Sequence, residues 1–379
     1  MTVSILATVA SVWGKAWPIL FAIVFFGLII FSHEVGHFTA AKLFRVKVNK
    51  FALGMGPSIL KKKKGETEYS VRLFPIGGFV LMEGEDEESA DSRSYSRKPV
   101  WQRMIIISAG AIVNLIVGLL IVALMLSLRA TQPTNNLIGT PQINRFYQNA
   151  STKATGLMEG DVVKKINGRR VFSDYDMNFL LSRNKDDAVD FVVERGGVIT
   201  KVDGVKFDTA ERNGETVMVF DFILVGIDLL DLSWPQRVSA LAKYSTAETV
   251  SIARIVWVSL FDLVTGRYGF RDISGPIGTV GYIVEVTTEV TNQASQKADL
   301  SPILTMLALI SVNIGIFNLL PVPALDGGKL FFLFIELIRR KPVNQKYEGW
   351  IHAVGLALLL LFMLVISFSD ILKLVRGQM

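Results

Sequence analysis

The chain contains no cysteine and only three histidines. Without cysteine it forms no disulfide bonds and no thiolate metal sites, so a zinc site here must use histidine and carboxylate ligands. Two of the three histidines, His33 and His37, fall within one pentapeptide. This scarcity makes that pentapeptide the first place to look for chemistry.

Charged residues are also missing from long stretches of the chain. Half of the 379 residues are hydrophobic, 24 are phenylalanine, and the mean hydropathy is +0.41. This composition is too apolar for an ordinary soluble protein and predicts an integral membrane protein with a soluble portion. A bilayer-spanning helix needs about 20 apolar residues. Four segments meet this requirement: residues 18–43, 104–128, 300–320 and 350–369. The first carries the histidines and lacks a small-residue cleavage site, which argues against a cleavable signal peptide.

The basic residues predict how the chain is oriented in the membrane. Residues 39–103 carry thirteen lysines and arginines, including Lys61 to Lys64, and residues 329–349 carry five more. The N-terminal seventeen residues contain only Lys15. Because cytoplasmic connections are enriched in Lys and Arg, both basic connections are expected in the cytosol and both termini outside. We interpret the lysine run as an orienting charge cluster and expect no nucleic-acid partner.

The first cytosolic connection predicts short strands beside the membrane. Residues 51–60, 68–74 and 76–82 have strand character and are separated by Gly65 and Pro75. The last segment is apolar between polar flanks, so it could enter the bilayer if its backbone were paired or lined a cavity. The acidic residues 83–91 that follow are expected to form a solvated linker.

The segment between the second and third spans predicts a small outer domain. Residues 154–168, with Gly160-Asp161 before a strand and Asn167-Gly168 after it, resemble the core signature of a PDZ domain. A helix is expected near residues 175–183 and a strand and hairpin at 189–197, whereas residues 200–216 match no expected element. PDZ domains capture extended peptides by strand addition. Residues 233–269 predict an amphipathic helix on the outer membrane surface, and residues 274–278 predict a turn leading to the third span.

The pentapeptide itself has the spacing of a metalloprotease motif. On a helix, His33 and His37 lie one turn apart on the same face and can bind one metal ion, with Glu34 beside them as candidate base. Ionisable groups inside a membrane segment are costly and usually functional. The pattern therefore favours a metal site over two histidines solvated at a helix end.

A third ligand is expected because catalytic zinc sites have three protein ligands and one open position. Asp326 is the only ionisable residue in 300–328. Spans one and three run in the same direction, so His33 and Asp326 are expected at a similar depth near the cytosolic side. Pro321 and Pro323 would break the helix there, where backbone can line a polar cavity. His352 begins the fourth span on the same side and is the alternative third ligand.

With these motifs in place, the chain resembles the site-two protease family of intramembrane zinc metalloproteases, in the bacterial regulator-of-sigma-E protease branch with a single PDZ domain. The resemblance rests on the histidine pentapeptide, the Asn-x-x-Pro-x-Pro-x-Leu-Asp-Gly pattern at 318–327, the Gly77 to Val80 hairpin, residues 274–277 and the PDZ insert. One departure is that Gly110 to Asn114 lacks the proline that relatives carry, which puts a role for Asn114 in doubt.

The resemblance implies an organisation for the whole chain. The expected fold is a mainly α membrane protein with four transmembrane helices, a cytosolic-side membrane-associated β-hairpin and an inserted extracytoplasmic PDZ (α+β) domain. Residues 1–130 would hold the first two spans, the zinc motif and the hairpin region 48–83. Residues 131–230 would form the PDZ-like domain, residues 231–299 a juxtamembrane connector, and residues 300–379 the last two spans with the Leu-Asp-Gly motif.

The resemblance also implies the roles of individual residues. His33, His37 and Asp326 would bind Zn²⁺, and Glu34 would act as the general base. Asn318 and the hairpin residues would bind substrate; these hairpin residues are Gly77, Gly78, Phe79 and Val80. The substrates would be single-span membrane proteins such as anti-sigma factors or remnant signal peptides, cut within the bacterial inner membrane near its cytosolic face. The PDZ domain would filter or dock them, through a groove whose ligand the sequence does not name.

Two alternatives belong to other functional classes. One is a catalytically inactive membrane scaffold that displays a PDZ domain. The other is a membrane zinc protease with the same His-Glu-x-x-His motif that acts on soluble or lipidated chains and takes its third ligand from a glutamate. The Leu325-Asp326-Gly327 segment argues against the latter.

Overall fold

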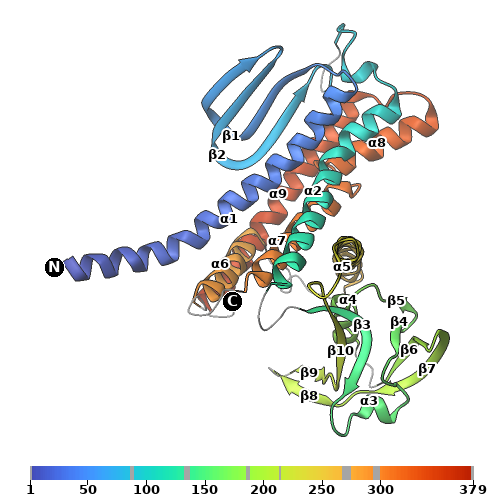
Figure 1. Cartoon of the computed structure of the whole chain (residues 1–379). Coiled ribbons are helices and arrows are strands. Elements are labelled where there is room, and N and C mark those ends of the chain that lie inside the picture. Colours follow the sequence, from blue (N-terminus) through green and yellow to red (C-terminus); the bar gives the residue numbers. More distant parts are fainter. Residues whose placement is uncertain are drawn as a thin grey trace. The chain divides into compact units, whose positions relative to one another are not determined.

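A computed structural model describes residues 2–85, 89–131, 137–184, 188–212, 215–266, 275–292 and 299–376. The chain divides into two compact units. The helical unit comprises Met1–Gly118 and Asp262–Met379, and the inserted unit comprises Leu119–Phe261. Figure 1 follows the elements of both units along the chain.

Within the described residues, four helices are long and apolar enough to cross a membrane. They are α1 (Thr2–Leu43), α2 (Val100–Arg129), α7 (Ser301–Leu319) and α9 (Gln345–Val375). Their apolar parts are Ala16–Leu43, Val100–Arg129, Ser301–Leu319 and Lys346–Val375. The four predicted spans are therefore confirmed as helices, each within a few residues of its expected bounds.

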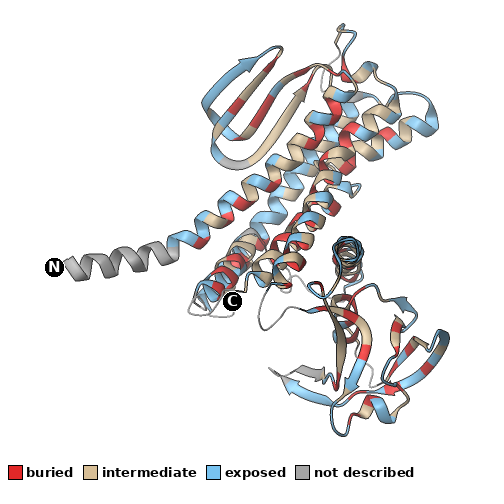
Figure 2. Cartoon of the chain, in the orientation of Figure 1, coloured by how far each residue is buried: buried red, intermediate tan, exposed pale blue. Residues whose placement is uncertain are grey.

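Many residues along these helices are exposed (Figure 2), and large apolar side chains are among them. Leu28, Leu120 and Leu364 are 60%, 62% and 68% exposed. Burying such side chains is worth about 1.5–3 kcal/mol each, so apolar surface this extensive would be costly in water. In a bilayer the lipid tails cover it, which is consistent with a multi-pass membrane protein.

Two further helices of the helical unit differ from the sequence-based expectations. α6 (Pro276–Asn292) begins at the proline where a turn was expected. Proline suits a first helical position, and Asp370 Oδ2 of α9 caps this end by accepting from the backbone N–H groups of Gly275 and Gly278, at 3.0 and 2.8 Å. Residues 329–349 were expected to be a short basic connection between spans, but helix α8 (Asp326–Arg339) occupies the first part of this stretch. Ser274 lies outside the described residues.

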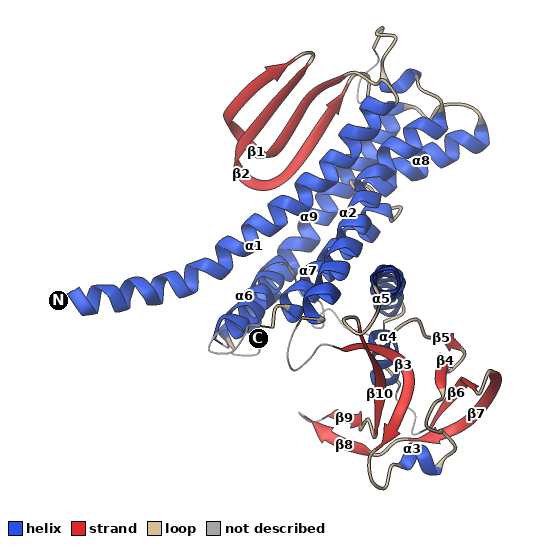
Figure 3. Cartoon of the chain, in the orientation of Figure 1, coloured by secondary structure: helices blue, strands red, loops and turns tan. Residues whose placement is uncertain are grey.

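The predicted strands after α1 form one sheet of two long strands, β1 (Val48–Lys64) and β2 (Thr67–Met82). The prediction of a break at Pro75 was wrong, because β2 continues through that position. Residues Lys50 to Leu53 of β1 have partners in β2 at Glu68 to Val71 and again at Gly78 to Leu81. Each strand therefore bends back, as Figure 3 shows. Residues 78–82 of β2, which we call the 78–82 arm, pair with β1. They directly follow Gly77, whose φ is positive at 82°.

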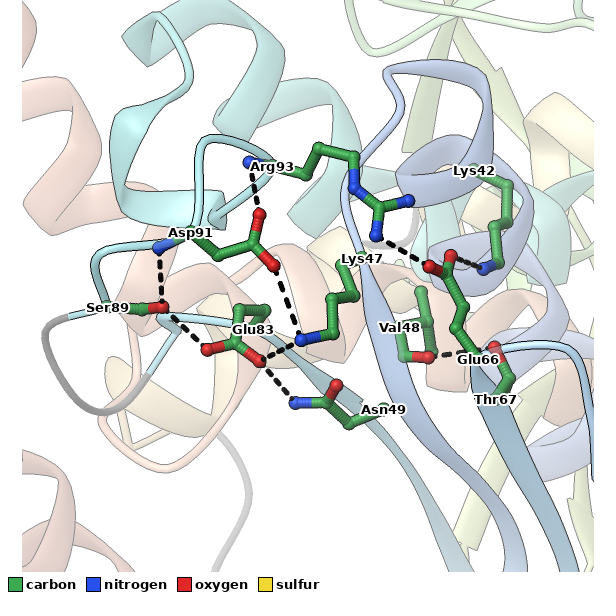
Figure 4. Close-up of polar contacts among 10 residues, drawn as sticks. All are labelled: Lys42, Lys47, Val48, Asn49, Glu66, Thr67, Glu83, Ser89, Asp91 and Arg93. Carbon is green, nitrogen blue, oxygen red and sulfur yellow. Dashed lines mark hydrogen bonds and ion pairs between the residues drawn. The ribbon is translucent and has the colours of Figure 1, made fainter.

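A polar network fastens the base of this sheet (Figure 4). Lys47 Nζ lies 3.2 Å from Glu83 and 3.3 Å from Asp91, and Glu83 also accepts from Asn49 and Ser89. These hydrogen bonds, with that from Ser89 the largest contribution, lower the pKa of Glu83 to about 2. The acidic stretch 83–91 was expected to be a solvated linker, and its two end residues, Glu83 and Asp91, are in fact bonded to Lys47 at the base of the sheet.

The inserted unit is built on short strands that pair antiparallel around an apolar core. Its main sheet has the order β10-β3-β4-β6-β7, with β5 paired to β4. Phe191, Ile143 and Val163 lie in the centre of its core and are fully buried. The strands are β3 (Leu137–Phe146), β4 (Val162–Ile166), β5 (Arg169–Arg170), β6 (Ala188–Arg195), β7 (Val198–Lys206), β8 (Thr209–Arg212), β9 (Glu215–Met218) and β10 (Phe222–Asp228). The predicted Asn167-Gly168 turn lies between β4 and β5, with positive φ at both residues.

Three helices complete the inserted unit. They are α3 (Ser151–Ala154), α4 (Asp174–Ser182) and α5 (Trp234–Val264). α4 confirms the helix expected at 175–183, and α5 confirms a helix in residues 233–269. Arg254 of α5 pairs with the buried Asp176 of α4, and Ser173 and Ser251 lie 2.9 Å apart through their hydroxyl groups. These contacts hold α5 against α4.

Candidate metal centre

The two histidines of the pentapeptide lie on one face of α1, as the helical spacing predicts. Their rings meet edge to face with centroids 4.7 Å apart. Both are largely shielded, since the side chains of His33 and His37 are 12% and 9% exposed. The face that they share is therefore a confined polar site within an apolar helix.

Asp326 brings the third ligand atom to this face. Its Oδ2 lies 3.0 Å from His33 Nε2 and 3.1 Å from His37 Nε2, and the two Nε2 atoms lie 3.1 Å apart. We call these three atoms the ligand triangle. Among the described residues, this is the group of histidine and acidic side chains that could hold a metal ion, and it contains no glutamate.

The ligand triangle has the dimensions of one face of a zinc coordination tetrahedron. With bonds of about 2.0–2.1 Å, two ligand atoms of a tetrahedral zinc ion lie about 3.3–3.4 Å apart. The observed sides of 3.0–3.1 Å differ from this by about 0.3 Å. Two imidazole nitrogens and one carboxylate oxygen are also donors that zinc accepts. The residues therefore fit zinc and leave a fourth position for water or substrate.

α2 supports the histidines from behind with a row of three residues one turn apart, Ile106, Gly110 and Asn114. The carbonyl oxygen of Ile106 lies 2.9 Å from His37 Nδ1. A proton on Nδ1 donates to this carbonyl and leaves Nε2 free to bind a metal. Asn114 lies 3.4 Å from His33 Nδ1 through its side-chain amide.

Gly110 allows α2 to approach the ligands closely. A Cβ atom at this position would lie 2.4 Å from His37 Nε2 and 2.8 Å from His33 Nε2. Gly36 plays the matching role on α1, since its Cβ would lie 2.5 Å from the backbone oxygen of Ala109. The two helices therefore meet through glycines at the level of the ligand triangle.

The segment that carries Asp326 is a tight turn between α7 and α8. Ala324 has φ 76°, a left-handed conformation that is uncommon outside glycine. A Cβ on Gly327 would lie 1.9 Å from the backbone oxygen of Leu320, so only glycine fits there. The helix break expected at Pro321 and Pro323 is confirmed, because α7 ends at Leu319 and α8 begins at Asp326.

His352, the alternative third ligand, has a different place. Its Nδ1 accepts a hydrogen bond from the backbone N–H of Ala324 at 2.9 Å. It therefore holds the turn that presents Asp326 and is not part of the ligand triangle. From the sequence, His352 was a histidine at the start of an apolar span and was considered only as an alternative metal ligand, so its role in holding the turn was missed.

Glu34 and the sheet meet beside the ligand triangle. A Cβ on Gly78 would lie 2.8 Å from Glu34 Cγ and 3.3 Å from Ile30 Cγ2, so β2 packs directly on this part of α1. Phe79 stacks under the Arg72 guanidinium, 4.7 Å from the ring centroid. Gly78, one of the predicted substrate residues Gly77 to Val80, therefore lies next to the predicted base. Asn318 is half-buried in the last turn of α7, and its substrate role stays a prediction.

Comparison with known proteins gives a consistent result over most of the chain. The sequence model of peptidase family M50 matches residues 21–362. The regulator of sigma-W protease RasP of Bacillus subtilis is 29% identical, over 93% of this chain and 97% of the relative. The zinc metalloprotease RasP of Bacillus licheniformis is 29% identical, over 93% and 98%. A protein of Clostridium acetobutylicum whose name also describes a zinc metalloprotease is 34% identical, over 93% and 97%.

Proposed function

The chain belongs to peptidase family M50 and is a zinc metalloprotease, and from this premise we propose that it cleaves peptide bonds within transmembrane segments of single-span membrane proteins. The observation that carries the proposal is the ligand triangle, which joins α1 to the α7–α8 turn in helices apolar enough to span a bilayer. A protease whose site lies among such helices acts on substrates that enter from the membrane.

We assign the ligand triangle, His33, His37 and Asp326, to the zinc ion. When bound, zinc polarises the scissile carbonyl and lowers the pKa of a bound water to about 7. Glu34, next to His33 in the sequence, accepts the proton of the attacking water on its carboxylate. It then delivers this proton to the leaving amine nitrogen as the C–N bond breaks. Asn318 is assigned to the substrate carbonyl.

The 78–82 arm of β2 is assigned to substrate binding. A peptide bond in a helix is hydrogen-bonded and shielded, so a substrate helix must unwind before attack. Within the described residues, this arm has its ladder partners in β1. Its other edge can accept an extended substrate by strand addition, and Gly78 holds that edge against Glu34.

We further propose that the inserted unit is an extracytoplasmic PDZ domain that filters or docks substrates. The turn-strand-turn arrangement of Gly160-Asp161, β4 and Asn167-Gly168 supports this assignment. The Lys and Arg distribution supports a topology with both termini outside and the zinc site near the cytosolic face of the bacterial inner membrane. The name of the Bacillus subtilis relative supports an anti-sigma factor as one substrate, with remnant signal peptides as another.

Glu34→Gln tests the proposal and separates it from an inactive PDZ scaffold. The variant keeps the shape of the side chain and all three ligands, so it should fold and bind zinc but cleave nothing. Comparing the membrane proteomes of cells with the intact enzyme and with this variant should reveal single-span fragments that accumulate only with the variant. If none accumulate, and a purified single-span substrate is cut equally by both proteins, the proposal is wrong.

A matched pair of variants tests the ligand assignment. Asp326→Asn should lose zinc, whereas Glu336→Gln on the same helix α8 should retain it. If Asp326→Asn retained zinc and substitution of a glutamate abolished zinc binding, the result would instead favour the type of metalloprotease that has a glutamate as its third ligand.

A further inference from the structure

The side chain of Asn114 lies in the middle of the apolar helix α2 and is fully buried. It contacts two adjacent residues of α1. One end of its amide lies 3.4 Å from His33 Nδ1, and the other lies 3.1 Å from Ser32 Oγ. Ser32 Oγ also lies 2.8 Å from the carbonyl oxygen of Ile29. Asn114 therefore stands between a proposed zinc ligand and a hydroxyl that is already engaged.

The protons in this cluster can be assigned from the metal site outward. Nε2 of His33 belongs to the ligand triangle, so it needs its lone pair for the metal. A neutral imidazole with a free Nε2 carries its proton on Nδ1. That proton needs an acceptor, and Asn114 is the group beside it. Its amide oxygen can accept this proton, whereas its NH₂ group cannot.

The same orientation of the amide satisfies Ser32. In the structure the NH₂ group of Asn114 faces His33 Nδ1 and its oxygen faces Ser32 Oγ. A half-turn about the terminal bond exchanges the two groups, so that the oxygen faces His33 and the NH₂ group faces Ser32. Ser32 then accepts from Asn114 and donates its single proton to Ile29. In the opposite orientation Ser32 would have to donate one proton to two acceptors. His33 Nδ1 would also have to accept, which would put the imidazole proton on the metal-binding nitrogen.

We propose that Asn114 is a positioning residue that holds His33 in the zinc-binding tautomer, as Ile106 does for His37. The resulting chain runs from His33 Nδ1–H to the Asn114 oxygen, from the Asn114 NH₂ group to Ser32, and from Ser32 to the Ile29 carbonyl. α2 thus fixes both imidazoles, His37 through a backbone carbonyl and His33 through a side chain. This inference rests on the proposed ligand set.

A purely structural role for Asn114 would be to join helices without orienting His33. Buried polar side chains in membrane helices also join helices by hydrogen bonds. Asn114 takes part in such a contact through its backbone, because its carbonyl oxygen accepts from Ser311 Oγ of α7 at 2.8 Å. Ser311→Ala removes this bond at the same depth and leaves the amide in place. It is therefore the matched control for helix packing.

The test measures zinc affinity of the full-length protein in detergent by competition with a chelator. Loss of a partner that orients a metal ligand typically weakens binding about 10- to 100-fold. We expect Asn114→Leu to show this loss. Asn114→Asp keeps an acceptor for His33 Nδ1–H and should bind zinc at least as tightly as the wild type. Ser311→Ala should lower the melting temperature and leave zinc affinity unchanged.

Two results would overturn the inference: wild-type zinc affinity in Asn114→Leu, or an Asn114→Asp variant as weak as Asn114→Leu. A wild type that binds no zinc would remove the proposed metal centre itself and this inference with it. A second measurement does not depend on the folding of any Asn114 variant. In ¹⁵N-histidine spectra of the zinc-loaded wild type, assigned with His33→Gln, His33 should bind zinc through Nε2 and carry its proton on Nδ1, and coordination through Nδ1 would overturn the inference.

Discussion

Gly110→Ala should disable the zinc site by adding one methyl group. The added Cβ would lie 2.4 Å from His37 Nε2 and 2.7 Å from His33 Cε1, whereas ordinary contacts begin at 3.4 Å. About 1 Å of separation is therefore missing, and the atoms in the way belong to the proposed metal ligands His33 and His37. α2 must move outward, or the rings must turn away from Asp326.

Either response weakens zinc binding. If α2 moves by about 1 Å, the 2.9 Å contact between His37 Nδ1 and the Ile106 carbonyl becomes too long for a hydrogen bond. Loss of such an orienting partner weakens metal binding about 10- to 100-fold, and displacement of a ligand ring weakens it further. Overpacking should also cost about 1–3 kcal/mol of stability. We expect zinc affinity to fall at least 10-fold, with a parallel loss of protease activity.

Two other glycines separate the site effect from the packing effect. A Cβ on Gly118, two turns further along α2, would lie 2.5 Å from Val312 Cγ2 rather than from an atom of the ligand triangle. Gly118→Ala should reduce stability without changing zinc affinity. A Cβ on Gly27 would meet nothing within 4 Å, so Gly27→Ala should behave like the wild type. Chelator competition and thermal unfolding of all four proteins test this. Equal zinc affinity in Gly110→Ala and Gly118→Ala would refute the geometry.

Three further predictions concern supporting contacts. His352→Phe removes the acceptor for the Ala324 N–H and should lower zinc affinity about 10-fold, as chelator competition would show. Arg195→Met removes the 2.7 and 2.8 Å contacts of the fully buried Asp161 and should lower the free energy of unfolding in urea by about 3 kcal/mol. Lys164→Met removes an exposed ion pair and should lower that free energy by less than about 1 kcal/mol. Burial raises the pKa of Glu248 to about 7, so its contribution to stability is full below about pH 4.5 and is lost as the pH rises through 7. Glu248→Gln should flatten that decline in melting temperature, and an unchanged slope would contradict the assignment.

The grouping of His33, His37 and Asp326 could be predicted because ionisable side chains are conspicuous in an apolar background. Two histidines at helical spacing and a lone aspartate after an uncharged span are costly in a membrane unless they serve a function. The support from α2 could not be predicted in the same way. The Ile106 carbonyl has no side-chain signature, and Gly110 matters because it lacks a side chain. Asn114 did offer a signal, as an amide within an otherwise apolar span.

The errors in the fold have equally local causes. Pro276 suggested a turn, although proline also suits the first position of a helix, and the Asp370 cap that stabilises this start comes from 92 residues further on. The basic residues after Asp326 suggested a solvated connection and concealed the helix α8. Pro75 suggested a strand end, but the pairing of β2 with β1 on either side carries the strand through it.

The distance along the chain between the ligands has a consequence for biosynthesis. His37 and Asp326 meet at 3.1 Å but are 289 residues apart in sequence. At about 5–20 residues per second, a ribosome needs roughly 15–60 s to make the segment between them. Throughout that interval the emerging chain holds only two of the three proposed zinc ligands. A hydrolytic centre that is completed only after the third span has been made cannot act on other nascent membrane helices beside it at the translocon.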